Sequence, residues 1–291
     1  MNLEDKFFQQ LVSWFHDKNQ KAIIALSGGV DSAVVAMAAK KALDKNAIAV
    51  TADYNTLSAD ELKSAKIIAK EINIEHKIIK YNELDNIEFV KNDSLRCYHC
   101  RTELSTYLLK EARQMNVHLI VDGTNTDDLT DYRPGIKALR ENGIQSPLVE
   151  LGINKQNVRN IAKSNNLSVY DKSSNSCLAS RIPHGMPVTF EKLKRIETAE
   201  SLVKSIFKVK QVRVRDHQDI ARIEVGREEI KDMFDTGKLS EIDSKLKDLG
   251  FKHIALDLSG YKSRENINTP SSNKQLRSRT SWHNFQFHLN D

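Results

Sequence analysis

The chain has 291 residues, of which 40% are hydrophobic and 29% charged, a composition typical of a globular protein with a sizeable core. It contains no apolar run long enough to span a membrane and no basic start followed by an apolar stretch, so we expect a cytoplasmic protein without a membrane partner. The formal net charge of +5 suits an anionic small molecule and gives little support for nucleic acid as a partner. An odd count of three cysteines favours reactive or metal-binding thiols over a disulfide framework.

Apolar runs and amphipathic patterns alternate through the first half of the chain. The predicted helices cover residues 4–19, 32–43, 58–72, 104–115 and 155–166. The predicted strands cover residues 22–26, 47–52, 76–80, 117–121 and 146–150. Strands separated by helices predict an α/β domain over residues 1–170, with a parallel sheet that has helices on both faces.

The pattern changes after residue 170. Residues 171–187 predict a loop, because they are rich in turn-forming residues. A smaller α+β domain is predicted for residues 188–263, from a long helix that starts near residue 190 and from later segments at 211–215, 220–225, 238–249 and 253–258. Residues 264–291 are polar and without periodicity, so we expect a tail that does not belong to the fold.

A glycine-containing turn follows the first predicted strand and reads Ser27-Gly28-Gly29-Val30-Asp31-Ser32. Glycines let the backbone approach a ligand closely, and successive amides at a helix start form a cradle for phosphate oxygens. The two serine hydroxyls add donors, whereas Asp31 fits an anion site only through Mg²⁺ or as a brace for the loop. The alternative is an ordinary glycine turn in which Ser32 caps the helix.

The string lacks the lysine of a Walker A loop and resembles the signature of the PP-loop ATP pyrophosphatases. The resemblance implies ATP and Mg²⁺ as cofactors, cleavage of ATP between its α and β phosphates, and transfer of AMP to an acceptor oxygen. Residues 49–52 resemble the strand end that holds adenine, which makes Ala52 a candidate contact. Residues 122–128 resemble a second ATP-side motif, with Gly123, Thr124 and Asp128 as candidates. A strand end followed by an Asn/Asp turn is the alternative for this segment.

Three thiols are the other chemical feature. Cys97 and Cys100 form a C-x-x-C pair, and Cys177 lies in the polar loop beside Ser180 and Arg181. These two neighbours supply donors for an anion and favour a thiolate at Cys177. A buried, inert Cys177, a thioredoxin-like pair or a zinc site with a histidine ligand are the alternatives that the residues leave open.

Together with these motifs, residues 96–100, 131–135, 197–200, 213–215 and 221–225 resemble the LarE family of sulfur transferases, over most of residues 5–263. The resemblance implies adenylation of a carboxylate of pyridinium-3,5-biscarboxylic acid mononucleotide and sulfur insertion to a thiocarboxylate, in biosynthesis of the nickel-pincer cofactor of lactate racemase. In one family mechanism the cysteine matching Cys177 is sacrificed. In the other, three cysteines hold a [4Fe-4S] cluster that carries an exchangeable sulfide. The three cysteines of this chain favour the cluster, with sulfide or another compound as sulfur donor.

Residues on the second domain are candidates for substrate contacts. Arg213 and Arg215 alternate on a predicted strand, so both point to the same face, where two guanidinium groups suit a phosphate. The family resemblance implies that they hold the substrate's phosphate with help from Ser180 and Arg181. Glu224 lies among apolar residues, and its burial would require an arginine partner. A solvent-exposed strand face is the alternative.

We expect catalytic roles for Cys177, Asp31 and Glu200. Glu200 shares a helix face with Glu197, and one of the two could bind Mg²⁺ or assist proton transfer, unless this face only contacts solvent. We expect the enzyme to be a homo-oligomer. The rival interpretations are a tRNA thiolase of the same superfamily, an amide-forming ligase that uses ammonia, and a nucleotide-binding redox or metal sensor.

Overall fold

The structure, a computed structural model, describes residues 3–129, 133–173 and 176–261. Two of the sequence predictions lie outside these residues: the tail 264–291, and the Asp131 and Tyr132 portion of the 131–135 motif. No helix within the described ranges is long and apolar enough to cross a membrane.

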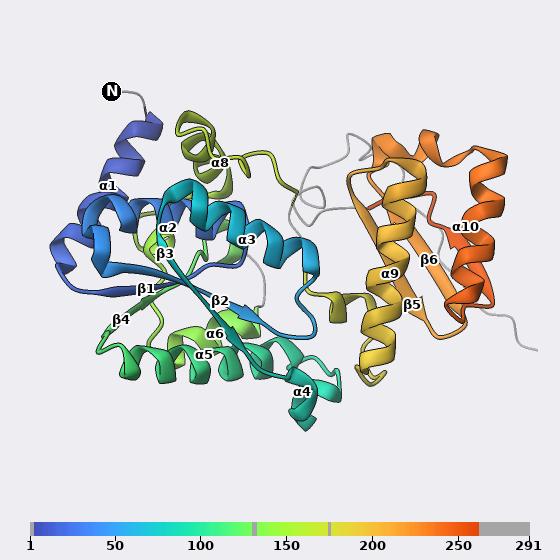
Figure 1. The fold of residues 1–291 in the computed structure, drawn as a ribbon, viewed down its shortest axis with the longest axis horizontal. Helices are drawn as coiled ribbons and strands as arrows, with labels where there is room; N and C mark the ends of the chain where they lie inside the picture. Colours follow the sequence, from blue (N-terminus) through green and yellow to red (C-terminus); the bar gives the residue numbers. More distant parts are fainter. Residues whose placement is uncertain (1–2, 130–132, 174–175, 262–291) are drawn as a thin grey trace, which may run out of the picture.

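The first half of the chain forms a parallel sheet with the order β3-β2-β1-β4 (Figure 1). Its strands are β1 (Ala22–Ala25), β2 (Ala47–Asp53), β3 (Glu75–Lys80) and β4 (Leu119–Val121). All three neighbouring pairs are parallel, with Ala22 opposite both Ala47 and Leu119. This arrangement confirms the predicted fold class. It also brings the carboxyl ends of the strands to one edge, which is where ligands bind in such sheets.

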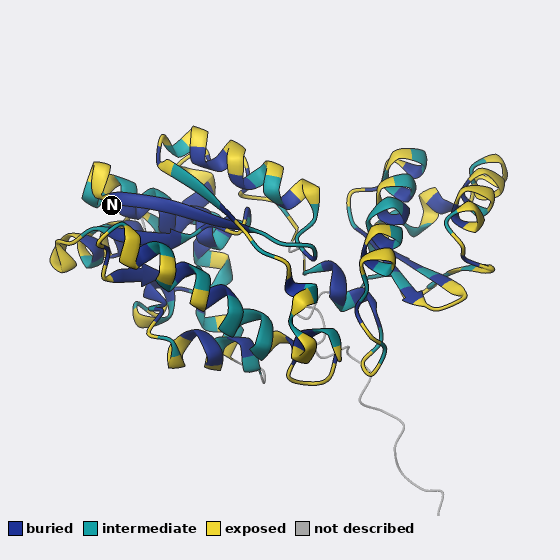
Figure 2. Cartoon of the chain, turned by 60° about the horizontal axis from the view of Figure 1, so that its bottom comes forward, coloured by how far each residue is buried: buried dark blue, intermediate teal, exposed yellow. Residues whose placement is uncertain are grey.

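Helices cover both faces of this sheet, which explains the unbroken apolar sequence of β1 and β2. Ala22 and Ile24 of β1 pack in one core cluster, while Ile23 packs in another. The first face carries α1 (Leu3–Lys18), α2 (Val30–Leu43), α3 (Ala59–Ile72) and α8 (Lys155–Ser164). The second face carries α5 (Arg96–Gln114) and α6 (Pro134–Glu141). Figure 2 shows β1 and β2 as buried along most of their length.

Two predicted elements differ in the structure. The strand predicted at residues 146–150 is wrong, because this segment forms the short helix α7 (Pro147–Glu150). Pro147 occupies the first helical turn, where its fixed φ favours a helix. Only Gln145 continues the sheet, as an isolated bridge to Val121. The helix predicted from residue 104 is α5 and begins earlier, at Arg96, so both cysteines of the C-x-x-C lie within its start.

Short elements connect the main ones. They are η1 (Asp44–Asn46), η2 (Glu83–Asp85), α4 (Ile87–Val90), η3 (Thr126–Leu129) and η4 (Leu178–Arg181). The segment from η4 onward leads into the second part of the molecule. Leu178 and Ala179 of η4 pack with Phe89 and with Leu193 and Ile196, so this apolar cluster joins the two parts.

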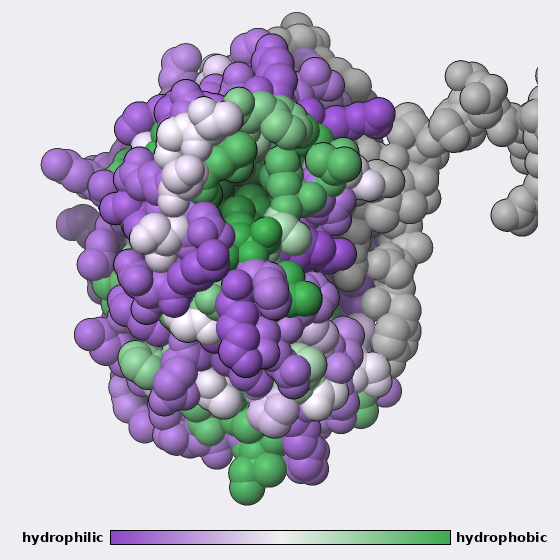
Figure 3. All heavy atoms as spheres, turned by 90° about the vertical axis from the view of Figure 1, so that its right-hand side faces the viewer, coloured by the Kyte–Doolittle hydropathy of each residue, from purple (hydrophilic) through white to green (hydrophobic). Residues whose placement is uncertain are grey.

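The second part is a three-stranded sheet with the order β5-β6-β7 and two helices. Its elements are α9 (Phe190–Phe207), β5 (Val212–His217), β6 (Ile220–Val225), η5 (Arg227–Met233), α10 (Thr236–Asp248) and β7 (His253–Leu256). β5 and β6 are antiparallel, and β6 and β7 are parallel. Val214 and Ile223 face the core with residues of both helices. Figure 3 shows apolar side chains gathered in a hollow on the outer face of this part.

Candidate active site

The turn after β1 leads into α2 without a side chain that caps the first helix amides. Gly28 has φ +84°, and a Cβ at this position would lie 2.4 Å from the carbonyl oxygen of Glu61. The N-cap of α2 is Gly29, with no side-chain hydrogen bond to the helix amides, so the alternative in which Ser32 is the N-cap is wrong. Instead, the Ser32 hydroxyl donates to the Gly29 carbonyl at 3.1 Å, and Ser27 N–H donates to the Ser32 hydroxyl oxygen at 3.1 Å. The helix amides therefore remain available to an anion.

Two lysines from distant segments support this loop. Lys172 Nζ donates to the Gly28 carbonyl and to Glu61 Oε2, both at 2.9 Å. Lys155 Nζ forms a salt bridge with Asp31 Oδ2 at 2.5 Å. Asn125 Nδ2 donates to the other oxygen of the Asp31 carboxylate at 3.0 Å. Asp31 is thus braced within the loop in this structure, which is one of the two roles that the sequence left open for it.

The segment after β4 lies directly against the loop. A Cβ on Gly123 would lie 2.6 Å from the backbone nitrogen of Ser32, so only glycine permits this approach. The Asp122 carboxylate accepts hydrogen bonds from the Ser146 hydroxyl at 2.7 Å and from Thr124 N–H at 3.1 Å. These contacts bring the two predicted ATP-side motifs together at the carboxyl edge of the sheet.

Asp128 lies further along the same segment. Its carboxylate accepts from Asn125 N–H at 3.1 Å and forms a salt bridge with Arg133. Burial raises the pKa of Asp128, while the hydrogen bond from Asn125 and the charge of Arg133 act in the opposite direction. Asp128 therefore has protein partners here, and a role in positioning Mg²⁺ or ATP stays a prediction.

Ala52 lies where β2 extends past its neighbour. The last register pair between β1 and β2 is Ala25 with Val50, whereas β2 continues to Asp53 beside β3. Ala52 is 8% exposed and pairs with Ile79 on the β3 side. This position beyond the end of β1 agrees with the predicted adenine contact, which no described contact tests.

The three thiols gather around one end of α5. Cys97 and Cys100 lie at its start and Cys177 comes directly before η4; all three are free cysteines. Cys100 and Cys177 pack against the apolar cluster that contains Phe89 and Leu178. Burial raises the pKa of the Cys177 thiol, and the charges of Arg96 and Arg181 only oppose this effect. Arg181 thus acts in the expected direction, toward a thiolate, but in the chain without a ligand the effect of burial is larger.

Glu83 is a buried carboxyl beside these thiols that the sequence analysis missed. It has no solvent exposure, accepts a hydrogen bond from the Thr56 hydroxyl, and burial raises its pKa. Burial also raises the pKa of Cys100, and the charge of Glu83 raises it further. Burial therefore shifts both the Cys100 thiol and the Glu83 carboxyl toward their neutral forms.

The Cys177 loop contacts the carboxyl edge of the sheet directly, because Leu178 N–H donates to the Thr56 carbonyl, just past the end of β2, at 3.0 Å. Arg101 follows Cys100 on α5. Burial alone would lower its pKa, but the charges of Tyr54, Cys100 and Asp122 raise it. Among sequence signals, only its place next to the C-x-x-C could have drawn attention to it.

Arg181 and Glu200 form a buried pair. Arg181 Nε and Nη2 donate to the two carboxylate oxygens of Glu200 at 2.8 and 3.1 Å, and the Arg181 side chain has no exposure. Arg181 Nη1 also donates to the carbonyl of Cys177 at 2.9 Å and to the Ser180 hydroxyl at 3.1 Å. Glu200 accepts from Val214 N–H at 3.1 Å. These contacts fix the Cys177 loop to α9 and β5, and direct roles in substrate binding or catalysis stay predictions.

The arginines of β5 lie on the face opposite the core. Arg215 Nε and Nη2 donate to the Glu224 carboxylate, both at 3.0 Å, which confirms the arginine partner expected for that buried carboxylate. Arg215 Nη1 reaches the Ser180 carbonyl at 2.8 Å. Arg213 lies 5.0 Å from the ring centroid of Tyr261, and burial lowers its pKa. A largely buried cluster of charged side chains therefore adjoins the Cys177 loop, while its role toward a substrate stays a prediction.

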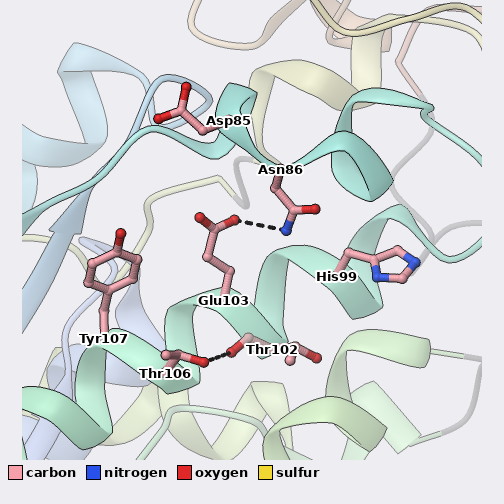
Figure 4. A pocket seen from close by; sticks show the side chains of 7 residues that line it. All are labelled: Asp85, Asn86, His99, Thr102, Glu103, Thr106 and Tyr107. Atoms are coloured by element: carbon pink, nitrogen blue, oxygen red, sulfur yellow. Dashed lines mark hydrogen bonds between the residues drawn. The ribbon is translucent and has the colours of Figure 1, made fainter.

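A separate surface pocket of about 480 Å³ lies on the outer side of α5 (Figure 4). Thr102, Glu103 and Thr106 of α5 line it, and Asn86 Nδ2 donates to Glu103 Oε2 at 3.1 Å across it. None of its lining residues belongs to the turn after β1, although His99, which lines it, lies between Cys97 and Cys100.

Comparison with known proteins agrees with this geometry. Residues 21–96 match the family described as queuosine biosynthesis protein QueC. The chain is 32% identical to pyridinium-3,5-bisthiocarboxylic acid mononucleotide synthase of Lactiplantibacillus plantarum over 247 residues, which is 84% of this chain and 88% of that protein. It is 41% identical to an uncharacterized protein of Synechocystis over 249 residues, 86% and 92% of the two chains. It is also 47% identical to 7-cyano-7-deazaguanine synthase of Clostridium botulinum over 68 residues, 23% and 31% of the two chains.

The parallel sheet and the amide-lined turn at its carboxyl edge define an ATP-using enzyme of the PP-loop class, with Mg²⁺ accompanying the nucleotide. The long match to the synthase is specific within that class. The chain belongs to the LarE family, to which pyridinium-3,5-bisthiocarboxylic acid mononucleotide synthase also belongs. Membership in this family confirms the predicted enzyme class, an ATP-dependent enzyme that transfers sulfur.

Proposed function

We propose that this enzyme adenylates a carboxylate of pyridinium-3,5-biscarboxylic acid mononucleotide and replaces one carboxylate oxygen with sulfur, in biosynthesis of the nickel-pincer cofactor of lactate racemase. The observation that carries the proposal is that the Cys177 loop contacts the carboxyl edge of the parallel sheet, through Leu178 N–H and the Thr56 carbonyl, while Cys100 packs against the same apolar cluster as Cys177. The name of the Lactiplantibacillus plantarum relative supports the substrate.

The first half-reaction follows from the loop geometry. A substrate carboxylate oxygen attacks the α-phosphorus of ATP, and pyrophosphate leaves with the electron pair of the broken P–O bond. The uncapped amides of α2 and the Ser27 and Ser32 hydroxyls would bind the pyrophosphate, and Lys155 and Lys172 hold the loop in shape. Catalysis by this half of the site is thus mainly positioning and charge neutralisation.

In the second half-reaction, sulfur attacks the activated carbonyl carbon and AMP leaves. Cys97, Cys100 and Cys177 would hold the sulfur-carrying group, which we propose is a [4Fe-4S] cluster. Thiolates are the usual ligands of such clusters. With three cysteine ligands, the fourth iron would have no protein ligand and would carry the exchangeable sulfide. The predicted roles of Arg213, Arg215, Ser180 and Arg181 on the substrate side belong to this proposal, with Glu200 and Glu224 as their partners.

The residues present fit such a cluster by their chemistry. The described part of the chain has no group of His, Cys, Asp or Glu side chains that converges on one metal ion. A cluster does not require this convergence, because each thiolate binds a different iron atom. Cys100 and Cys177 pack against the same apolar cluster, and Cys97 lies three residues before Cys100 on α5, which supports one shared site for the three thiols. Arg96 and Arg181, which lower the pKa of Cys177, would offset part of the negative charge of a thiolate-bound cluster.

Anaerobic purification with assays for iron and sulfide and an absorbance spectrum tests the cluster. We expect the wild-type chain to hold about four irons, and the Cys97→Ala and Cys177→Ala variants to lose all of them together. An iron-free wild-type chain that loses the mass of H₂S from residue 177 after one turnover would contradict the cluster and support sacrifice of Cys177. Stimulation of ATP turnover by tRNA, and not by the pyridinium mononucleotide, would contradict the substrate.

We also propose that the enzyme is a cytoplasmic homo-oligomer with sulfide or another small sulfur compound as donor, and that its domains divide near residues 170 and 188. Free thiols suit a reducing compartment. Exposed apolar side chains on the second part, such as Phe234 and Leu258 at 62% and 73% exposure, support association through this part (Figure 3). Light scattering of the purified chain gives the oligomeric state, and a monomer at all concentrations would contradict the proposal.

A further inference from the structure

The turn before the C-x-x-C also binds the loop that follows Cys177. Asn92 lies in this turn, between α4 and α5, and has no solvent exposure. Its side-chain amide donates to the carbonyl oxygens of Pro183 and Met186, both at 2.8 Å. Its backbone carbonyl accepts from Gly185 N–H at 3.0 Å. One buried asparagine therefore holds three residues of the loop 182–186 in place.

Arg96 extends this network to both cysteine segments. It is the first residue of α5, adjacent to Cys97, and is 6% exposed. Its Nη1 donates to the Asn92 side-chain oxygen and, at 2.9 Å, to the carbonyl of Ala179, two residues after Cys177. A continuous set of hydrogen bonds thus connects the start of the C-x-x-C helix with the segment that carries Cys177.

The chemistry of position 92 calls for asparagine. Its backbone has φ +56°, in the left-handed region that asparagine tolerates better than most residues. Its side-chain amide acts as both donor and acceptor: the NH₂ group donates to carbonyl oxygens, and the amide oxygen accepts from Arg96. Removing the NH₂ donors would take one hydrogen bond from each of the part-buried carbonyls of Pro183 and Met186, and the Pro183 carbonyl would keep only the one from Met186 N–H, which favours movement of the loop toward solvent.

We propose that Asn92, acting with Arg96, is a positioning residue that fixes Cys177 relative to Cys97 and Cys100. The reason for fixing Cys177 rests on the proposed function, in which the three thiols act together. The fixed position of Cys177 does not depend on that function, because it is a property of the chain without iron or substrate. Asn92 acts through the loop backbone and through Arg96, and has no described contact with any of the thiols.

Thiol crosslinking of the iron-free full chain tests the proposal. Dibromobimane bridges two thiols when each thiolate displaces one bromide, with loss of two HBr, and peptide mapping identifies the pair. The bridge between Cys97 and Cys100 within α5 serves as an internal reference for bridges to Cys177. The variant Asn92→Asp keeps the size, the tolerance of positive φ and the acceptor for Arg96, but replaces the NH₂ donors with a carboxylate oxygen. We expect the ratio of Cys177 bridges to the reference bridge to fall about ten-fold, because two part-buried hydrogen bonds that hold the loop are lost.

A second variant and a matched control keep the test decisive. Asn92→Gly, which suits the backbone, should lower the ratio in the same way if Asn92→Asp does not fold. Asn73→Asp changes an exposed asparagine with the same left-handed backbone (φ +57°) on α3 and should keep the wild-type ratio. A wild-type ratio in both Asn92 variants, or a wild-type chain that never links Cys177, would overturn the proposal. Absence of a cluster in wild-type protein would instead overturn the proposed cluster and leave this result standing.

Discussion

At the scale of single residues, two glycines define how closely the chain approaches the expected nucleotide. Gly28 combines a left-handed backbone with a contact that excludes a side chain, and Gly123 lets the segment after β4 touch the start of α2. Both the close contact and the positive φ disfavour a side chain at Gly28. Gly143 isolates the effect of the backbone angle, because it has a similar φ of +76° but nothing within 4 Å of an added Cβ.

We predict that Gly28→Ala destabilises the fold by about 1–3 kcal/mol and weakens ATP binding at least about ten-fold, since the loop must move to relieve the clash with the Glu61 carbonyl. Gly143→Ala is the control and should cost about 1 kcal/mol without a change in ATP affinity. Denaturant unfolding and calorimetric titration with ATP measure both. Equal effects of the two substitutions would show that the close contact at Gly28 is unimportant.

Sequence reasoning worked well for residues whose role lies in their local string. The amide-lined turn follows from two glycines between a strand and a helix, and the need of Glu224 for an arginine follows from its apolar neighbours. It failed for Lys155, Lys172 and Glu83, because their partners are distant in the chain and nothing beside them in the sequence signals those contacts. The effect of Arg181 on the Cys177 pKa has the expected direction, but the larger, opposite effect of burial could not be predicted, because the polar neighbours in the sequence do not reveal it.

At the scale of elements, a histidine connects two strands to the loop that follows the first. The Thr51 hydroxyl of β2 donates to the Leu26 carbonyl at 2.7 Å, directly before the loop. The Thr51 oxygen must therefore accept the second bond, from His76 Nε2 of β3 at 2.8 Å. Burial lowers the pKa of His76 from 6.5, and the charge of Lys66 lowers it further.

This arrangement predicts a pH dependence of stability. Because the pKa of His76 is lower in the folded chain, the unfolded chain takes up the proton first as the pH falls. The stability that neutral His76 provides is therefore complete above about pH 6.5 and is lost as the pH falls through the lower, folded-state pKa. We predict that His76→Gln, whose amide can still donate to Thr51, reduces the loss of stability between pH 7.5 and 5 by about 1 kcal/mol or less.

Unfolding in denaturant at several pH values gives this difference. The control is His118→Gln, at an exposed position, which should retain the wild-type pH profile. Identical profiles for His76→Gln and the wild-type chain would contradict the assigned role of His76.

Element prediction succeeded where the apolar period was long and clear, as in α2, α9 and the buried strands. It failed at residues 146–150, because four residues are too few to distinguish a strand from one helical turn. It placed the start of α5 too late, because Arg96 to Glu103 are mostly polar and their helical state depends on contacts with α4, α6 and the Cys177 loop. The same contacts place the cysteines of the C-x-x-C, so the geometry of the thiols could not be predicted from the pattern.

At the scale of the whole molecule, a buried ion pair joins the Cys177 loop, which connects the two parts, to the second part. Arg181 and Glu200 connect the Cys177 loop with α9 and, through Val214 N–H, with β5. Ala59 N–H at the start of α3 donates to Glu197 at 2.9 Å and adds a second link between the parts. The buried pair has the larger energetic consequence, because an unpaired charge in its place would lack solvent.

We predict that Arg181→Met or Glu200→Met alone destabilises the chain by about 3 kcal/mol or more, and that the double substitution costs less than the sum of the two. The exposed pair Glu241–Lys245 on α10 is the control, and Lys245→Ala should cost less than about 0.5 kcal/mol. Chemical denaturation of the wild-type chain, the two single variants and the double variant provides the double-mutant cycle. Additive costs of the two single substitutions would show that the pair is not coupled.

The central claim is that a carboxylate oxygen of the pyridinium mononucleotide attacks the α-phosphorus of ATP before sulfur enters. The most direct measurement supplies the substrate with ¹⁸O in its carboxylates, together with ATP, Mg²⁺ and a sulfur donor, and determines the masses of all products. We predict pyrophosphate, a thiocarboxylate product and AMP that carries one ¹⁸O from the substrate. Unlabelled AMP, or ADP and orthophosphate in place of AMP and pyrophosphate, would contradict the claim.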